Sequence, residues 1–491
     1  MPTVSALHRP VVLSLLACAS LAGCLVGPNY RRPATPISLT YKEAAGWAPI
    51  HPSDAADRKD WWTVFNDPTL NELERRVAAS NQTLAAAEAA YRQARALVSE
   101  QRAALFPTIT LNGSATVASG NSGGTTVISG TNGGTTSGGT TAVTTTGNRT
   151  TYQIGAGASW APDLWGAVRR AIENAKATAQ SDEALVANAR LSAQMELAVD
   201  YIQLRQLDQE KRLYDTTVAS YARSLAVTQN KYKVGVAARS DVLTAESQLA
   251  SAQATDEDLA QQRAKSEHAI AILAGQTPAS LTLPSAAWTL QPPDIPAGVP
   301  SALLQRRPDV ASSERLAAAA NAAIGIQVAA YYPNLTLSAE GGAASSALSK
   351  LFNASNTFWS LGASVAETVF DAGLRKARVA AARAAYDQAV ANYRQTTLTA
   401  FGQVEDNMAA QRVLIAEQVY TRRSSGAATQ NVTITLNEYR AGTVDYTTVA
   451  TAQATALNAQ NGELALEAMR LSTAVDLIAA LGGGWTAADL R

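Results

Sequence analysis

The sequence predicts a mixed fold in which β-hairpins and long helical hairpins each occur twice in one chain. Two observations carry this prediction. Proline is absent from 163–277 and from 334–491, and such runs favour long helices because proline breaks helix interiors. Beside or within each run, short segments alternate between apolar and small polar residues, which is the period of a β-strand.

Length and composition exclude several classes of protein. The chain has 491 residues, with 40 basic and 40 acidic side chains and a formal net charge of zero. Phosphate binding needs a basic excess, so no nucleic acid partner is expected. Two cysteines and three scattered histidines form neither a disulfide framework nor a metal site, and no phosphate-binding loop or catalytic triad is present. We therefore expect no cofactor and no enzymatic activity.

Residues 1–23 have the features of an export signal peptide. The apolar run 11–22 leads into Leu21-Ala22-Gly23-Cys24, which resembles the lipobox of bacterial lipoproteins. That resemblance implies cleavage before Cys24 and acylation of this cysteine, for example with palmitate; the alternative is an ordinary signal peptide with a chance cysteine. Leu25 stands where an aspartate would mark retention in the inner membrane, so the resemblance implies a lipid anchor in the outer membrane. No later apolar run is long enough for a transmembrane helix.

An internal duplication organises the rest of the chain. The segment 105–111 recurs as 331–337, and 232–235 recurs as 439–442. After an acylated N-terminal segment, we expect a first repeat, a proline-rich linker, a second repeat and a C-terminal tail. Their predicted bounds are 24–68, 69–277, 278–300, 301–480 and 481–491.

Each repeat contains one predicted β-hairpin, at 105–160 and at 332–366, with one apolar and one small, polar face. The apolar positions are Ile109, Leu111, Tyr152, Ile154, Ala156, Ala158, Trp160, Leu335, Leu337, Trp359, Leu361, Ala363 and Val365. This alternation fits a transmembrane β-barrel, apolar outside and wet inside; a soluble hairpin packed on the helices is the alternative. The segment 113–150, rich in Gly, Ser and Thr, is predicted to be a flexible loop.

Each repeat also contains one long helical hairpin. We expect its helices at about 165–231 and 241–273 in the first repeat, and at about 372–437 and 449–480 in the second. The connecting turns contain Gly235 and Gly442, whose backbone freedom suits a tight reversal. Pro308 and Asp309 suit the first turn of a further helix.

Four strands are too few to close a barrel, and open strand edges in lipid leave backbone groups without partners. Chains with this pattern must therefore assemble. Two copies would give a lumen filled by side chains, whereas three copies, with 12 strands, would leave room for a passage.

Several motifs resemble those of the outer-membrane factors, the TolC/OprM-like efflux and secretion channels, especially their NodT-type lipoprotein branch. The most specific is LLQRRPDV at 303–310. The others are GPNY at 27–30, WW at 61–62, DLWG at 163–166, FDAG at 370–373 and YRAGTVDY at 439–446. The motifs span nearly the whole chain in the family's order. The resemblance implies a homotrimer with a 12-stranded β-barrel in the outer membrane, continuous with a 12-helix periplasmic α-barrel.

The same resemblance implies partners and site residues. The expected partners are a periplasmic adaptor (membrane fusion protein) and an inner-membrane pump of the RND or a similar type, with small molecules such as drugs and toxic compounds as cargo. The residues matching the adaptor-docking turns are Val234, Gly235, Val236, Gly442, Thr443, Val444 and Asp445. The candidates for the periplasmic gate are Asp241, Tyr232, Tyr439, Tyr446, Thr448 and Thr451. Thr448 and Thr451 stand where family members often carry aspartates.

Two other functions stay open at this stage. A lipid-anchored periplasmic coiled coil, acting as an adaptor or a structural protein, would explain Cys24 and the helices but not the paired strands. An outer-membrane channel of a type I protein secretion system would share all of these features.

Overall fold

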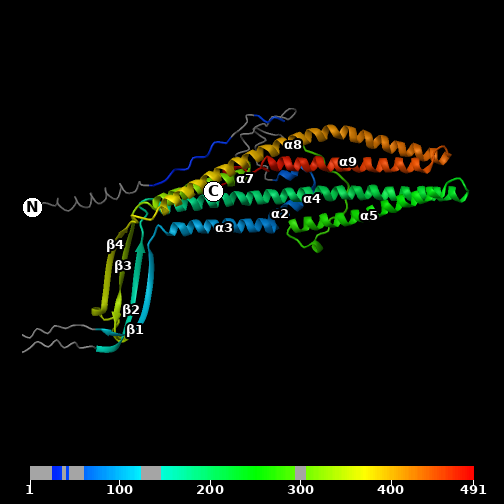
Figure 1. The fold of residues 1–491 in the computed structure, drawn as a ribbon. Helices are drawn as coiled ribbons and strands as arrows, with labels where there is room; N and C mark the ends of the chain where they lie inside the picture. The colour runs from blue at the N-terminus through cyan, green and yellow to red at the C-terminus, as the bar shows by residue number, and fades with distance from the viewer. Residues whose placement is uncertain (1–24, 36–39, 44–59, 123–144, 294–305, 491) are drawn as a thin grey trace, which may run out of the picture. The chain divides into compact units, whose positions relative to one another are not determined.

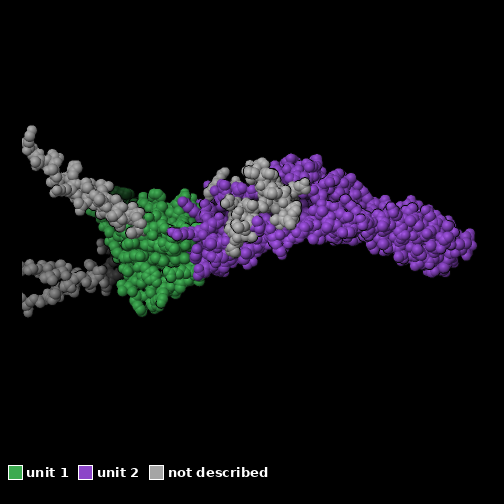
Figure 2. All heavy atoms as spheres, turned by 90° about the horizontal axis from the view of Figure 1, so that it is seen from above, with its two compact units in different colours: residues 1–30, 97–175, 321–384 green, residues 31–96, 176–320, 385–491 purple. Residues whose placement is uncertain are grey.

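The computed structural model describes residues 25–35, 40–43, 60–122, 145–293 and 306–490. The predicted signal peptide and Cys24 lie outside these residues. The chain divides into two compact units, coloured separately in Figure 2. Unit 1 comprises 1–30, 97–175 and 321–384, and unit 2 comprises 31–96, 176–320 and 385–491.

Unit 1 contains a four-stranded antiparallel sheet in the order β1-β2-β3-β4 (Figure 1). The strands are β1 (Thr108–Ser122), β2 (Thr145–Trp160), β3 (Asn334–Ser345) and β4 (Thr357–Ala366). The predicted hairpins are both present, and β2 joins them by pairing with β3, so that Trp160 lies opposite Leu337. Two short 3-10 helices, η4 (Leu348–Lys350) and η5 (Ala354–Asn356), connect β3 to β4.

The prediction of a loop over the whole of 113–150 is wrong at both ends. Residues 113–122 continue β1 and pair with 145–154 of β2, from Gly113 opposite Ile154 to Ser122 opposite Thr145. Antiparallel pairing uses only backbone groups, so a segment rich in Gly, Ser and Thr can extend a hairpin although Val117 is its one large apolar residue. Residues 123–144 lie outside the described residues.

In unit 1, the segment that directly follows Cys24 in the sequence is held by Arg170, near the start of a long helix. The Arg170 guanidinium donates hydrogen bonds to the carbonyl oxygens of Val26 and Gly27 and to the Asn29 side chain. Gly325 permits this arrangement, because a Cβ there would lie 2.8 Å from Cγ of Arg170. The GPNY motif thus has a structural role within this unit.

The helices agree closely with the predicted ones, and Figure 1 shows each long helix followed by one that runs back along it. The predicted helical hairpins are α4 with α5 and α8 with α9, and Pro308 begins α7 as expected. The helical elements are η2 (Trp61–Phe65), α2 (Pro68–Ser80), α3 (Gln82–Ala103), α4 (Ala167–Lys233), α5 (Arg239–Leu273), η3 (Pro278–Ser280), α7 (Pro308–Ala329), α8 (Leu374–Ala441), α9 (Tyr446–Ala480) and η6 (Ala487–Asp489).

The main hydrophobic core of unit 2 joins the N-terminal segment to three long helices. Trp61, Trp62 and Phe65 of η2 pack in one cluster with residues of α2, α4, α5 and α9. Asp67 begins α2 by accepting hydrogen bonds from the backbone amides of Thr69 and Leu70, as expected of an N-cap. The WW motif therefore contributes side chains to the core.

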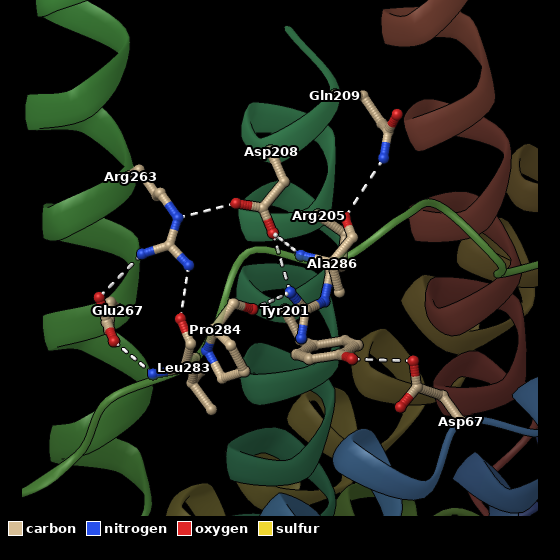
Figure 3. Close-up of polar contacts among 10 residues, drawn as sticks. All are labelled: Asp67, Tyr201, Arg205, Asp208, Gln209, Arg263, Glu267, Leu283, Pro284 and Ala286. Carbon is tan, nitrogen blue, oxygen red and sulfur yellow. Dashed lines mark hydrogen bonds and ion pairs between the residues drawn. The ribbon is translucent and has the colours of Figure 1, made fainter. Parts of the chain in front are cut away.

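A buried polar network fixes the start of the proline-rich linker to the helices of unit 2 (Figure 3). Asp208 of α4 accepts a hydrogen bond from Arg263 of α5 at 2.7 Å and another from the backbone amide of Ala286 at 3.2 Å. Arg205 bridges the same carboxylate to the carbonyl oxygen of Pro284. Burial alone would raise the pKa of Asp208, but hydrogen bonds from Arg263, the Ala286 amide and Arg205 outweigh it and lower this pKa.

Among the described residues, no helix is both long and apolar enough to cross a membrane.

Candidate functional site

The strand register places the predicted apolar positions of all four strands on one face of the sheet. Leu111 lies opposite Ala156, which lies opposite Gly341, which in turn lies opposite Trp359. Because side chains alternate between the faces of a strand, these pairings fix the shared face for every second residue. We call this surface the apolar face.

The apolar face carries large side chains that unit 1 leaves uncovered. Within the chain, Trp359 and Leu361 are 78% and 75% exposed. The exposed large apolar side chains of the strands all lie on this face: Ile109, Leu111, Val117, Trp160, Trp359, Leu361 and Val365. Contiguous exposed apolar surface of this kind is typical of a membrane-facing or partner-facing surface.

The opposite face of the sheet is small and polar. One row across it consists of Thr110, Gly157, Glu340 and Ser360. Phe358 is the aromatic exception, and its ring covers the facing pair Gly155 and Gly342. A Cβ added at Gly342 would lie only 3.1 Å from Cζ of Phe358. The two faces therefore differ in polarity, as the sequence alternation predicts.

The two turns between the long helices are open and rest on glycines with positive φ. Gly235 has φ +77° and Gly442 has φ +81°, and a Cβ at either would meet nothing within 4 Å. The first turn presents Val234 and Val236, which are 73% and 70% exposed. The structure thus places the residues predicted to dock an adaptor at uncovered ends of helical hairpins.

Two aspartates of the predicted sites cap the helices that leave the turns. Asp445 accepts hydrogen bonds from the side chain and backbone amide of Thr448, at 2.7 Å and 2.9 Å. Both hydrogen bonds lower the pKa of Asp445. Asp241, in the first turn of α5, accepts one from the backbone amide of Ala238 at 3.3 Å. Each aspartate therefore has a local role at a helix start.

The predicted gate tyrosines fall into two groups. Tyr439 and Tyr446 are buried near the turns, with ring centroids 5.6 Å apart in an edge-to-face arrangement. Tyr439 donates a hydrogen bond to Thr228 of α4, and Tyr446 donates one to Gln248 of α5. Burial raises the pKa of Tyr446 to about 12. These two side chains join the second hairpin to the first, whereas Tyr232 is exposed.

Of the remaining candidates, Thr451 donates a hydrogen bond from its hydroxyl to the carbonyl oxygen of Thr447, within its own helix.

Lys231 contacts a predicted gate residue but was not predicted from the sequence. Its ammonium lies 4.0 Å from the centroid of the Tyr439 ring, and it also donates a hydrogen bond to the Tyr439 carbonyl oxygen. Lys231 directly precedes the repeated segment 232–235, and this position was the available signal. Within the described part of the chain, no cluster of three or more His, Cys, Asp or Glu side chains could hold a metal ion.

Comparison with known proteins agrees with this architecture. The sequence profile of the outer membrane efflux protein family matches residues 73–276 and 299–483. A probable efflux pump outer membrane protein, TtgC of Pseudomonas putida, is 30% identical over 483 residues, covering 96% of each chain. Outer membrane protein OprJ of Pseudomonas aeruginosa is 28% identical over 483 residues, also covering 96% of each.

Solved structures are similar over nearly the whole chain. The outer-membrane channel OprN has a TM-score of 0.84 at 29% identity, covering 94% of this chain and 100% of that one. The CmeC outer membrane channel of Campylobacter jejuni has a TM-score of 0.85 at 22% identity, covering 95% and 96%, which indicates the same fold. On the profile match and the full-length similarity to TtgC, this chain belongs to the outer membrane efflux protein family.

Proposed function

We propose that this chain is one subunit of an outer-membrane channel that carries small molecules out of the cell in a tripartite efflux system. The observation that carries the proposal is the two-faced sheet, which exposes large apolar side chains on one face and small polar ones on the other. Lipid would cover the first face and water the second. The coiled-coil adaptor hypothesis leaves this sheet unexplained, and such a channel performs no chemistry.

The sheet edges support assembly into a homotrimer. In the order β1-β2-β3-β4, the outer edges of β1 and β4 have no partner strand among the described residues. Unpaired backbone groups in the bilayer core cost several kcal/mol each, so β4 of one subunit would pair with β1 of the next. Three subunits would then close a 12-stranded barrel, with the long helices continuing it as a 12-helix periplasmic tube.

We assign adaptor docking to the two open turns. Their glycines bring backbone close to the surface, and the exposed Val234 and Val236 offer a small apolar contact to a helical hairpin of an adaptor. An energised inner-membrane pump would supply the cargo. Relatives are named for toluene and antibiotic efflux, which supports small organic molecules rather than secreted proteins as cargo.

We assign periplasmic closure to the tyrosine contacts. Tyr439 and Tyr446 hold α8 and α9 against α4 and α5 near the turns, so the helices separate there only if these hydrogen bonds break. Exposed Tyr232 and half-buried Asp241 are the remaining candidates for a ring contributed by several subunits. Thr448 and Thr451 are engaged locally and have the weaker case.

Conductance across a planar lipid bilayer tests the channel. We expect the double variant Tyr439→Phe/Tyr446→Phe to conduct more than the wild-type protein, because it keeps the rings but removes both hydrogen bonds.

Ion selectivity tests the polar face in the same bilayer. We expect Glu340→Gln to lower the channel's preference for cations over anions, because this carboxylate lies on the polar face. Glu367→Gln, beyond the end of β4, is the matched control. Absence of conductance in both the wild-type and the double variant would contradict the proposal.

Binding to a cognate adaptor tests the docking assignment. We expect Gly442→Trp to weaken binding and export while oligomers still form. Two controls accompany this variant. Gly442→Ala introduces the backbone strain of a side chain at positive φ without the bulk of a ring. Gly462→Trp adds the same ring at an equally open position inside α9, away from the turn. Unchanged binding by Gly442→Trp would refute the assignment.

A further inference from the structure

A cavity of about 310 Å³ lies among the helices of unit 2. Its walls come from four elements: the middle of α4, the start of α7, α8 and the end of α9. Leu191, Met195 and Pro308 supply apolar wall, whereas Asn188 and Asn407 supply side-chain amides. The volume is at the lower end of the range for sites that take small organic molecules.

One acidic side chain in the cavity wall, Asp476, differs from the other in its interactions. Among the described residues, no hydrogen bond or ion pair reaches the carboxylate of Asp476. The other acidic side chain, Asp309, is already paired with Arg307 at 2.6 Å. Arg307 also donates a hydrogen bond to Gln403 at 2.7 Å, so its own donors are engaged. The cavity therefore holds one uncompensated carboxylate beside apolar wall.

Burial raises the pKa of Asp476, because the charged carboxylate has lost part of its hydration. Arg307 and Asp309 are the other charged groups that line the cavity, and α4 and α8 contribute amides and a hydroxyl there. A cation beside Asp476 would restore the interaction that burial removes. This carboxylate therefore gains more from a cationic ligand than a fully hydrated one would.

We propose that this cavity binds a small organic cation with an apolar body, whose ammonium group pairs with Asp476 and whose apolar part contacts Leu191, Met195 and Pro308. The amide oxygens of Asn188 and Asn407 would accept hydrogen bonds from the remaining ammonium N–H groups. A bare metal ion fits less well, because the part of the chain described here brings no three His, Cys, Asp or Glu side chains together. The site lies within one chain, so it does not depend on the channel proposal.

A pair of matched ligands tests the proposal on the purified full-length protein in detergent. Naphthylethylamine is protonated at mildly alkaline pH, and naphthylethanol has nearly the same shape without the charge. We expect saturable binding of the amine, measured by naphthalene fluorescence, about tenfold tighter than that of the alcohol. Asp476→Asn should remove this preference. Asp406→Asn, an exposed carboxylate on α8 outside the cavity wall, should keep it.

A second variant separates ligand binding from folding. Ala479→Phe places a ring in the cavity, so it should abolish saturable binding of both ligands while the far-ultraviolet circular dichroism stays that of wild type. Equal affinity for the amine and the alcohol, or a retained preference in Asp476→Asn, would overturn the proposal. Saturable binding that survives Ala479→Phe would also overturn it, because the ligand would then sit elsewhere.

Discussion

In the sheet of unit 1, Trp359 and Leu361 are 78% and 75% exposed, whereas Leu197 and Leu471 in the core of unit 2 are 0% and 1% exposed. Large apolar side chains are therefore exposed on the sheet of unit 1 and buried in the core of unit 2. An outward apolar face is stable when lipid covers it, and an inward one is stable when water surrounds the unit. The contrast agrees with the proposal that lipid covers the apolar face of the sheet, whereas the core of unit 2 is covered by its own chain.

The largest expected effect comes from placing a charge on the apolar face. Leu361→Arg should prevent assembly in the outer membrane, since a charge facing lipid near the bilayer midplane costs about 2–4 kcal/mol per chain. Ser360→Arg, the adjacent residue on the polar face, should still assemble. Membrane fractionation and heat-sensitive oligomer bands on gels measure both. Equal assembly of the two variants would show that lipid does not cover this face.

The buried network of unit 2 offers the next largest effect. Asp208→Ala leaves the buried Arg205 guanidinium without its carboxylate and should lower the free energy of unfolding by about 3–5 kcal/mol. Glu72→Ala removes only an exposed pairing with Arg75 and Arg76, so a change below about 1 kcal/mol is expected. Denaturant unfolding in detergent compares them, and similar losses would mean that the network contributes little.

Glu74 makes the stability of unit 2 depend on pH. Burial raises the pKa of Glu74 from 4.5 to about 9, and neither carboxyl oxygen has a hydrogen-bond partner among the described residues. Between these values the unfolded chain releases the proton and the folded chain keeps it, so stability falls as pH rises through this window.

Glu74→Gln imitates the neutral acid. Its free energy of unfolding should exceed that of wild type by a margin that grows by about 1.4 kcal/mol per pH unit within the window and vanishes below it. Unfolding measured at several pH values checks this, with the exposed Glu72→Gln as control. A margin independent of pH would contradict the assigned protonation.

The smallest expected effect concerns the two turns. Asp445 caps α9 with its side chain, whereas the equivalent position before α5 is Ala238, which has no side-chain cap. Asp445→Ala should therefore speed amide hydrogen exchange in the first turn of α9, and Ala238→Asp should slow it in the first turn of α5. Unchanged exchange in both variants would show that the turns do not differ in this way.

The elements with strong periodicity could be predicted from the sequence. The proline-free runs gave the long helices to within a few residues, and alternation identified the shared face of four strands before their register was known. The strand ends could not be predicted, because 113–122 contains small residues that fit a loop equally well.

Contacts between side chains far apart in the chain also could not be predicted from the sequence. Nothing local indicates that Asp208 meets Arg263 and the Ala286 amide, or that Asp476 lines a cavity with Asn188. Such contacts depend on how distant helices pack against one another. For the same reason, Tyr439 and Tyr446 are indistinguishable from Tyr232 in the sequence, although they are buried and Tyr232 is exposed.

We propose that sister chains complete the four-stranded sheet, whose two outer edges have no partner strand within the described part of the chain. Native mass spectrometry of the protein released from lipid nanodiscs tests this most directly. We predict a particle containing three copies of the chain. A particle containing a single copy would contradict the claim.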